Sequence, residues 1–301
     1  MSKKKSAAEE AAWTLDELRQ EVDRLDDALQ DLLIRRAEIT RAIARVKQPS
    51  PAAGLAQAIR PAREAQILRR LIARHKGDLP RRVVVRIWRE IIAASLQAQV
   101  KFQVHVYAGD SGAAFFDLAH AHFGSLTPVR GHSRVSVVVQ ECADEPNSVG
   151  VVPLPELEEQ GTPWWAQLAP AGQPGPRIFA KLPFIVHPDE NPPAAFAVGS
   201  VEQEASGDDT TLLRVESAAG FSRARLGGLL NGAGLEGTMI AAGQTGGQAS
   251  SGTVLLAVKG YVSPADRRLA AFRESAGDSV LQADPVGGFA NPIVLAPVAS
   301  R

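Results

Sequence analysis

Apolar residues between Trp13 and Lys47 recur at alternating spacings of four and three, which is the pattern of one long helix that packs along a seam. The seam residues are Leu18, Val22, Leu25, Leu29, Leu32, Ile39, Ile43 and Val46. Arg36 stands where the next seam residue belongs, between Leu32 and Ile39. Burying a guanidinium among apolar side chains is costly unless an anion meets it. Arg36 therefore predicts a carboxylate partner.

This helix is too long to serve one small domain alone. Thr14 and Glu17 form the sequence signature of a capping box at its start, and at about 1.5 Å per residue the helix extends for roughly 50 Å. Lys47 follows Arg36 by about three turns, so the two cations share a face about 16 Å apart and can converge on one ligand. Arg19 lies about 25 Å from Arg36 in the other direction. Arg19 can therefore serve the same ligand only from an antiparallel helix of a second subunit.

Two shorter helices follow a loop that is rich in proline, alanine and glycine. The first is expected to begin at Arg60-Pro61, because proline is favoured in the first turn of a helix. The second is expected to run from about Leu79 to Gln99. Its apolar line continues in steps of four to Ser95 and Gln99, so two neutral polar side chains are predicted to face inward.

The polar residues predicted to face inward comprise several cations, one carboxylate and two neutral groups. They are Arg36, Lys47, Arg63, Glu64, Ser95 and Gln99, with Arg19 from a second subunit. This set suits a small dianion that carries a hydroxyl group. It includes neither a nucleophile activated by histidine nor a cluster of metal ligands, so we expect no metal and no cofactor.

Residues 14–99 resemble the all-helical class of chorismate mutase. In that class, helix one carries an arginine near its start, a second arginine in its middle and a lysine at its end. Helix two opens with an Arg-Glu pair, and helix three has a serine and a glutamine four residues apart near its end. The matching residues are Arg19, Arg36, Lys47, Arg63, Glu64, Ser95 and Gln99. The resemblance implies a three-helix domain that forms an interlocked homodimer and rearranges chorismate to prephenate, in phenylalanine and tyrosine biosynthesis.

The resemblance also implies how the long helix contributes to catalysis. Arg36 and the partner's Arg19 would clamp the two carboxylates of chorismate and fold its enolpyruvyl arm over the ring. Lys47 and Gln99 would donate hydrogen bonds to the ether oxygen as the C–O bond lengthens and charge builds there. This rearrangement needs positioning and charge stabilisation, not covalent catalysis.

The remaining residues of the pattern would hold the substrate ring. Glu64 would accept a hydrogen bond from the ring hydroxyl, and Arg63 and Ser95 would help to fix the substrate. Arg60 stands three positions before the Arg-Glu pair, where the family often has another polar or acidic residue, and is assigned to substrate binding. The alternative for the whole region is a structural helical dimer without activity.

Residues 101–200 predict an α/β half-domain. The expected elements are strands at Lys101–Gly109, Val135–Val139 and Val149–Val152 and a helix at Gly112–Phe123. The stretch resembles the first lobe of prephenate dehydratase, through the loop at Gly109-Asp110-Ser111-Gly112 and the strand Val149-Gly150-Val151-Val152-Pro153.

The same resemblance indicates that the second dehydratase lobe is missing. Asn191–Phe196 stands where the family has an Asn-x-Thr-Arg-Phe motif, only a few residues after the strand at Ile178–Val186. In the family that motif follows a complete second lobe. Ala194 and Ala195 replace the threonine and arginine on which dehydration depends. We therefore expect no dehydratase activity; the alternative is a bifunctional chorismate mutase/prephenate dehydratase.

Residues 201–301 predict a β-α-β-β-α-β order, which is that of a ferredoxin-like unit. The expected elements are Thr210–Glu216, Arg223–Ala233, Leu235–Ala242, Thr253–Lys259, Pro264–Phe272 and Ser279–Ala283. The region resembles the ACT regulatory domain that follows dehydratases, but lacks its phenylalanine-binding signatures. We interpret the C-terminal part as a binding module, either a sensor for an aromatic amino acid effector or a docking surface for another enzyme of the pathway.

Charge and composition support this division of the chain. Residues 1–100 hold 20 Lys/Arg and 13 Asp/Glu, and the remainder holds 13 and 20. Basic residues alternate with acidic ones, which disfavours binding to nucleic acid or a membrane. A single cysteine and no apolar run near eighteen residues favour the cytoplasm. We expect a disordered tail at 1–12, a mutase domain at 13–100, a truncated dehydratase-like domain at 101–200 and an ACT-like domain at 201–301.

Overall fold

A computed structural model describes residues 13–46, 54–109, 112–158, 161–187, 192–218, 222–244 and 252–295. The chain divides into two compact units, Met1–Pro49 and Ser50–Arg301, and we describe each by itself. The predicted tail at 1–12 and the residue Lys47 lie outside the described residues. The helices among the described residues include none that combines the length and the apolar character needed to cross a membrane.

The described part of the first unit is one helix, α2 (Leu15–Val46). The predicted capping box is present, because the Thr14 N–H donates to Glu17 Oε2 at 2.7 Å and the Glu17 N–H donates to Thr14 Oγ1 at 3.3 Å. No residue of α2 is buried. The exposed fraction of the seam residue Leu25 is 56% and that of Leu32 is 66%. The apolar seam predicted from the sequence therefore lies exposed among the described residues of this unit.

The two shorter predicted helices belong to the second unit. Helix α4 (Pro61–Arg74) begins at the predicted proline, and α5 (Arg81–Gln97) lies within the range expected for the third helix. A short helix, α3 (Gly54–Ala58), precedes them and buries Leu55. A cluster that includes Leu68 of α4, Val85 of α5 and Phe184 joins these helices to the rest of the unit. The helices thus share a core with the α/β region.

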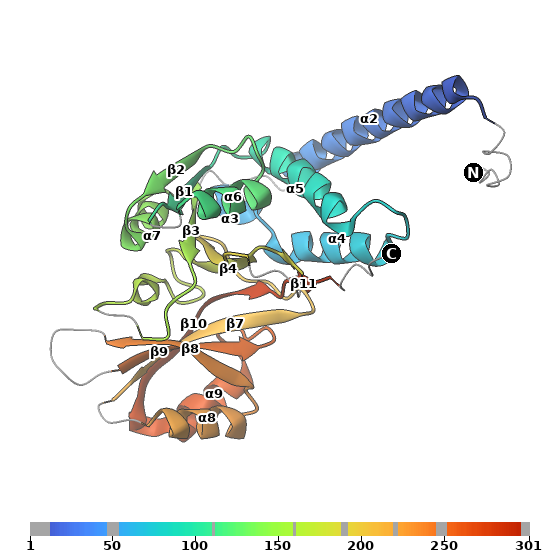
Figure 1. The fold of residues 1–301 in the computed structure, drawn as a ribbon. Helices are drawn as coiled ribbons and strands as arrows, with labels where there is room; N and C mark the ends of the chain where they lie inside the picture. The colour runs from blue at the N-terminus through green and yellow to red at the C-terminus, as the bar shows by residue number, and fades with distance from the viewer. Residues whose placement is uncertain are drawn as a thin grey trace. The chain divides into compact units, whose positions relative to one another are not determined.

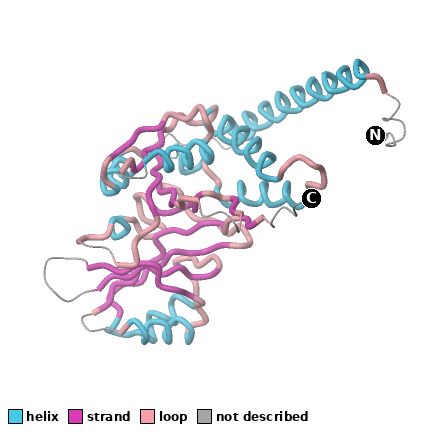
Figure 2. Tube along the Cα trace, viewed as in Figure 1, coloured by secondary structure: helices cyan, strands magenta, loops and turns pink. Residues whose placement is uncertain are grey.

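A nine-stranded sheet runs through the second unit (Figures 1 and 2). Its spatial order is β2 (Val129–His132), β1 (Gln103–Tyr107), β3 (Ser148–Pro153), β6 (Ala195–Gly199), β4 (Arg177–Leu182), β10 (Val280–Ala290), β7 (Asp209–Ser217), β9 (Gly252–Lys259) and β8 (Gly237–Gln244). Strands β5 (Ile185–Val186) and β11 (Ile293–Val294) form a separate pair. Residues predicted as two domains, 101–200 and 201–301, thus contribute to one sheet, and the predicted domain boundaries remain a prediction.

The first half of the sheet contains a parallel group in which β1 pairs with both β2 and β3. Parallel neighbours need crossover connections, which α6 (Gly112–Phe123) and α7 (Val135–Asp144) provide. The prediction of a strand at Val135–Val139 was wrong, because this segment is the first half of α7. Valine favours strands by local preference, but the chain must cross β1 to pass from β2 to β3, and a helix makes that crossing.

The second half has the predicted β-α-β-β-α-β order. Helix α8 (Arg223–Gly232) follows β7, and α9 (Arg267–Ala276) precedes β10. The four strands lie in the order β10-β7-β9-β8 with antiparallel neighbours. Leu226 of α8, Phe272 of α9 and Leu213 of β7 belong to one buried cluster. That this half is an ACT regulatory domain remains a prediction.

Candidate functional site

Glu64, the predicted acceptor for a substrate hydroxyl, lies in the first turn of α4 and forms an ion pair with the buried Arg89 of α5; the Glu64 side chain is 17% exposed. Arg89 Nη1 donates to Glu64 Oε2 at 2.8 Å. Burial raises the pKa of the Glu64 carboxyl, and the charge and hydrogen bond of Arg89 oppose that rise. Because one oxygen of the carboxylate pairs with Arg89, the other keeps its acceptor capacity.

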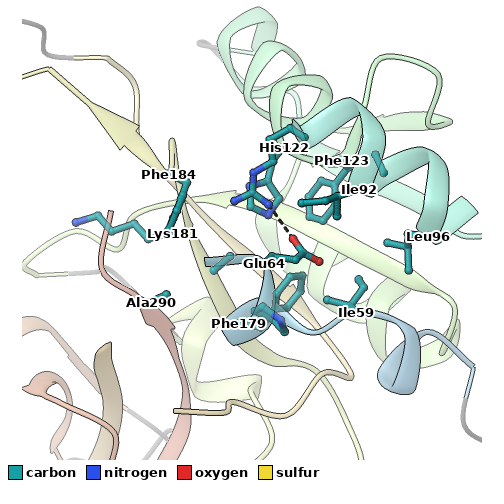
Figure 3. A pocket seen from close by; sticks show the side chains of 14 residues that line it. Ile59, Glu64, Ile92, Leu96, His122, Phe123, Phe179, Lys181, Phe184 and Ala290 are labelled. Carbon is teal, nitrogen blue, oxygen red and sulfur yellow. Dashed lines mark hydrogen bonds and ion pairs between the residues drawn. The ribbon is translucent and has the colours of Figure 1, made fainter. Parts of the chain in front are cut away.

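The pair lies beside a small cavity of about 30 Å³ (Figure 3). Phe123, Phe179 and Phe184 supply much of its apolar lining. His122 lies on the same cavity, and burial together with the nearby Arg89 charge lowers the pKa of His122 well below its ordinary value. A space of this size holds about one or two water molecules. Among the described residues, the enclosed space beside Glu64 is therefore of the size of ordered water.

The other predicted residues of α4 lie near its start. Arg63 is exposed. Arg60 immediately precedes the helix and binds Glu204, with Arg60 Nε to Glu204 Oε2 at 2.9 Å and Arg60 Nη2 to Oε1 at 2.7 Å. One hydrogen bond and one ion-pair contact to the same carboxylate orient the guanidinium. Arg60 is therefore held by a carboxylate of the α/β region, an arrangement that the sequence pattern did not predict.

The two neutral residues lie at the C-terminal end of α5. The half-buried Ser95 hydroxyl donates to the Ile91 carbonyl oxygen at 2.7 Å. Gln99 lies two residues beyond the helix, is exposed, and donates from Nε2 to the Ser95 carbonyl oxygen at 3.0 Å. The structure thus brings Ser95 and Gln99 together as neighbours.

The remaining predicted residues belong to the first unit. Arg36 lies in the middle of α2, and Arg19 lies in its second turn, where it pairs with Asp16 at 3.4 Å. Lys47 is outside the described residues. The structure therefore places Arg19 and Arg36 on one helix, and Arg60, Arg63, Glu64, Ser95 and Gln99 in the second unit.

Sequence reasoning missed the face of α5 that points away from Ser95. Arg82, Arg86 and Arg89 recur there at spacings of four and three, which places them along one side of the helix. They line a cavity of about 480 Å³ together with His122 and His187. The regular spacing of these arginines was visible in the sequence. Arginines at helical spacing, however, ordinarily form a solvent-exposed face and do not by themselves indicate a cavity.

Comparison with known proteins gives a family match for the helical region. Residues 18–100 match the model of chorismate mutase type II. A bifunctional chorismate mutase/prephenate dehydratase from Stutzerimonas stutzeri is 32% identical over 143 residues, which cover 47% of this chain and 39% of that relative. The chain therefore spans about two fifths of the length of this curated relative.

Two solved structures resemble the larger part of the chain at low sequence identity. One is described as GqqA, a novel type of quorum quenching acylases, with 12% identity, a TM-score of 0.45 and coverage of 62% of this chain and 94% of that one. The other is prephenate dehydratase from Streptococcus mutans, with 12% identity, a TM-score of 0.44 and coverage of 65% and 99%. The match over residues 18–100 is the informative one: this region is similar to the chorismate mutase type II family.

Proposed function

We propose that the chain is a chorismate mutase that converts chorismate to prephenate. The observation that carries the proposal is the family match over residues 18–100, a region in which every expected polar position is occupied by the expected residue type. Arg36 and the partner's Arg19 clamp the substrate carboxylates, and Lys47 and Gln99 donate to the ether oxygen. Neither covalent catalysis nor a cofactor enters this reaction.

The buried ion pair supports the role proposed for Glu64. Arg89 holds one carboxylate oxygen at 2.8 Å, which orients Glu64 and favours its charged form. The second oxygen accepts the hydrogen bond of the substrate hydroxyl. Arg63 and Ser95 bind the substrate from the same two helices, and Arg60 is held near them by Glu204.

The exposed seam of α2 supports a homodimer. None of the 32 residues of α2 is buried among the described residues, and a helix of a folded protein is stabilised mainly by packing of its apolar face. An antiparallel copy of α2 covers the seam and delivers the partner's Arg19 toward Arg36, which the distance along a single helix does not allow. The proposed site therefore requires the dimer, because one of its residues comes from the second subunit.

We also propose that the chain lacks dehydratase activity. Strand β5 ends at Val186 and β6 begins at Ala195, so the connection between them is too short to contain a second lobe. Ala195, at the position of the arginine in the dehydratase motif, is fully buried in β6 and carries no polar group. The bifunctional enzyme remains the alternative because the relatives that match are bifunctional.

The C-terminal half then serves regulation or docking, in a cytoplasmic enzyme. A separate candidate place for an effector is the cavity lined by Arg82, Arg86 and Arg89 of α5, which lies outside residues 201–301. Its arginines favour a ligand with a carboxylate, as phenylalanine and tyrosine have, and its volume of about 480 Å³ lies in the usual range for ligand pockets. Phenylalanine or tyrosine added to the mutase assay tests this. An effector that binds there changes kcat or KM of the unaltered chain but not of Arg86→Ala.

The central experiment is a chorismate assay on the full-length chain, with products separated before any acid treatment. Prephenate alone is the expected product, and phenylpyruvate would establish the bifunctional alternative. Arg36→Ala should lower turnover about a hundredfold or more while the dimer persists. Arg35→Ala is the matched control, because the neighbouring Arg35 is exposed and pairs with Glu38 at 3.0 Å. Absence of turnover in the unaltered chain, or unfolding of Arg36→Ala, would contradict the proposal.

A further inference from the structure

A histidine of the sheet lies close to two glutamates, one on α7 and one just after its end. His105 of β1 is completely buried, and its Nε2 has no hydrogen-bond partner among the described residues. Glu141 lies in the last turn of α7, and Glu145 is the residue that immediately follows the helix. One ligand atom from each of the three residues lies within 4.8 Å of those from the other two.

The other nitrogen of the His105 ring is held by a second histidine. His105 Nδ1 and His132 Nε2 are 2.8 Å apart, a hydrogen-bond distance. When His105 is the donor, its Nε2 presents a lone pair toward the two carboxylates. A histidine whose far nitrogen is fixed by a hydrogen bond while the near one carries a lone pair has the arrangement of a metal ligand.

The distance between His105 and Glu145 is compatible with a bridging metal ion. His105 Nε2 lies 3.6 Å from a Glu145 carboxylate oxygen, which is too long for a hydrogen bond. Two ligands that each lie about 2.0–2.2 Å from a tetrahedral ion are roughly 3.3–3.6 Å from one another. The observed separation is thus one that a bridging ion produces without movement of the backbone.

The donor set selects the class of ion. One imidazole nitrogen and two carboxylates suit borderline divalent ions such as Zn²⁺. Mg²⁺ and Ca²⁺ prefer oxygen ligands throughout, and the three donors include no sulfur for a soft ion. The Glu145 side chain is 54% exposed, so water can reach the fourth coordination position.

We propose that His105, Glu141 and Glu145 bind a divalent transition-metal ion of the Zn²⁺ class, with His132 orienting the His105 ring. The ion joins α7 to β1 and thereby ties a crossover helix to the sheet. It binds the folded chain and not the separated ligands of the unfolded chain, so it stabilises the second unit.

The test is Zn²⁺ titration of the full-length chain by calorimetry after removal of metals with a chelator, together with thermal unfolding. One equivalent of Zn²⁺ should bind and raise the unfolding temperature, and Mg²⁺ at the same concentration should do neither. Glu145→Gln should weaken Zn²⁺ binding at least tenfold and abolish the thermal shift. The matched control is Asp144→Asn, the neighbouring acid on α7, which bonds to Gln140 and should leave binding unchanged.

Further variants keep the proposal open to contradiction. Glu141→Gln should also weaken Zn²⁺ binding. His105→Gln should do the same if circular dichroism shows that this variant folds. If it does not fold, the two glutamate variants alone test the proposal. The proposal is overturned if the unaltered chain binds no Zn²⁺. It is equally overturned if binding survives in both Glu141→Gln and Glu145→Gln, which would place the ion elsewhere, or if Mg²⁺ binds as tightly as Zn²⁺.

Discussion

Helices α2 and α5 are predicted from the same kind of apolar periodicity, yet they are used differently. Helix α2 has 32 residues and buries none of them. Helix α5 has 17 residues and buries Val84, Val85, Arg89, Ala93 and Leu96. An apolar stripe therefore shows that a face needs cover, but not whether the cover comes from the same chain.

The largest effect is expected from charges in the seam of α2. The double substitution Leu25→Asp and Leu29→Asp should give a monomer in analytical ultracentrifugation, because the two carboxylates repel the apolar face of a second helix. Mutase turnover should fall by about a hundredfold or more, since the partner's Arg19 is then missing. Gln30→Asp, on the same helix but outside the seam, should leave both properties unchanged. A fully active monomer would show that α2 does not build the site.

The next effect concerns the buried pair between α4 and α5. Arg89→Met leaves the Glu64 carboxylate buried without its partner, which should lower the free energy of unfolding by about 3–5 kcal/mol. The double variant Glu64→Gln/Arg89→Met should recover part of this loss, because no uncompensated charge remains. Chemical denaturation measures both, and Arg86→Met, an exposed neighbour on α5, should change stability by only about 0.5 kcal/mol or less. Additive losses in the double variant would contradict a direct pair.

A smaller effect is expected in the pH dependence of the reaction. Burial raises the pKa of the Glu64 carboxyl, so on acidification Glu64 takes up a proton at a higher pH than an ordinary glutamate, whose pKa is about 4.3. Protonated Glu64 no longer offers a charged acceptor, and kcat/KM should fall through this range. The profile of Glu64→Gln should lack that limb. If kcat/KM falls over the same acidic pH range in both proteins, the fall is due to a group other than Glu64.

The smallest effect is expected at Cys142, in the core of the second unit. The side chain is fully buried, and burial raises the pKa of its thiol to about 12. A thiol in this state is unreactive, so a thiol reagent at pH 8 should label the native chain negligibly and the denatured chain completely. Gln30→Cys, on the exposed α2, should react at once. Rapid labelling of native Cys142 would mean that α7 opens readily from the sheet.

Sequence patterns predicted the helices better than the first half of the sheet. The apolar period and capping residues locate α2 and α4 because both signals are local, and Pro61 marks the start of α4. The valine-rich start of α7 and the unpredicted strand β2 depend on the sheet order instead, which is a non-local property. Local preference for strand at Val135–Val139 is overridden because that segment must cross the sheet.

The candidate site divides in the same way between local and non-local information. The residue types at Arg36, Glu64 and Gln99 follow from spacing along helices and a family resemblance. The partner of Glu64 does not, since Arg89 is 25 positions away and lies on a face of α5 that the apolar line leaves unmarked. His105 and Glu145 were missed for the same reason, because they come together only when α7 packs on β1.

The continuity of the sheet limits how the second unit can be divided. Strand β10 lies beside β4 at Gly287, where a Cβ would meet the backbone of Ile178. A gene fragment that ends near residue 200 would lack β10, so the edge of β4 that pairs with it would be exposed. The complementary fragment would lack β4 and would expose the corresponding edge of β10. Residues 101–200 and 201–301 are therefore poor modules for recombination or separate expression: they can diverge in sequence, but each completes the sheet of the other.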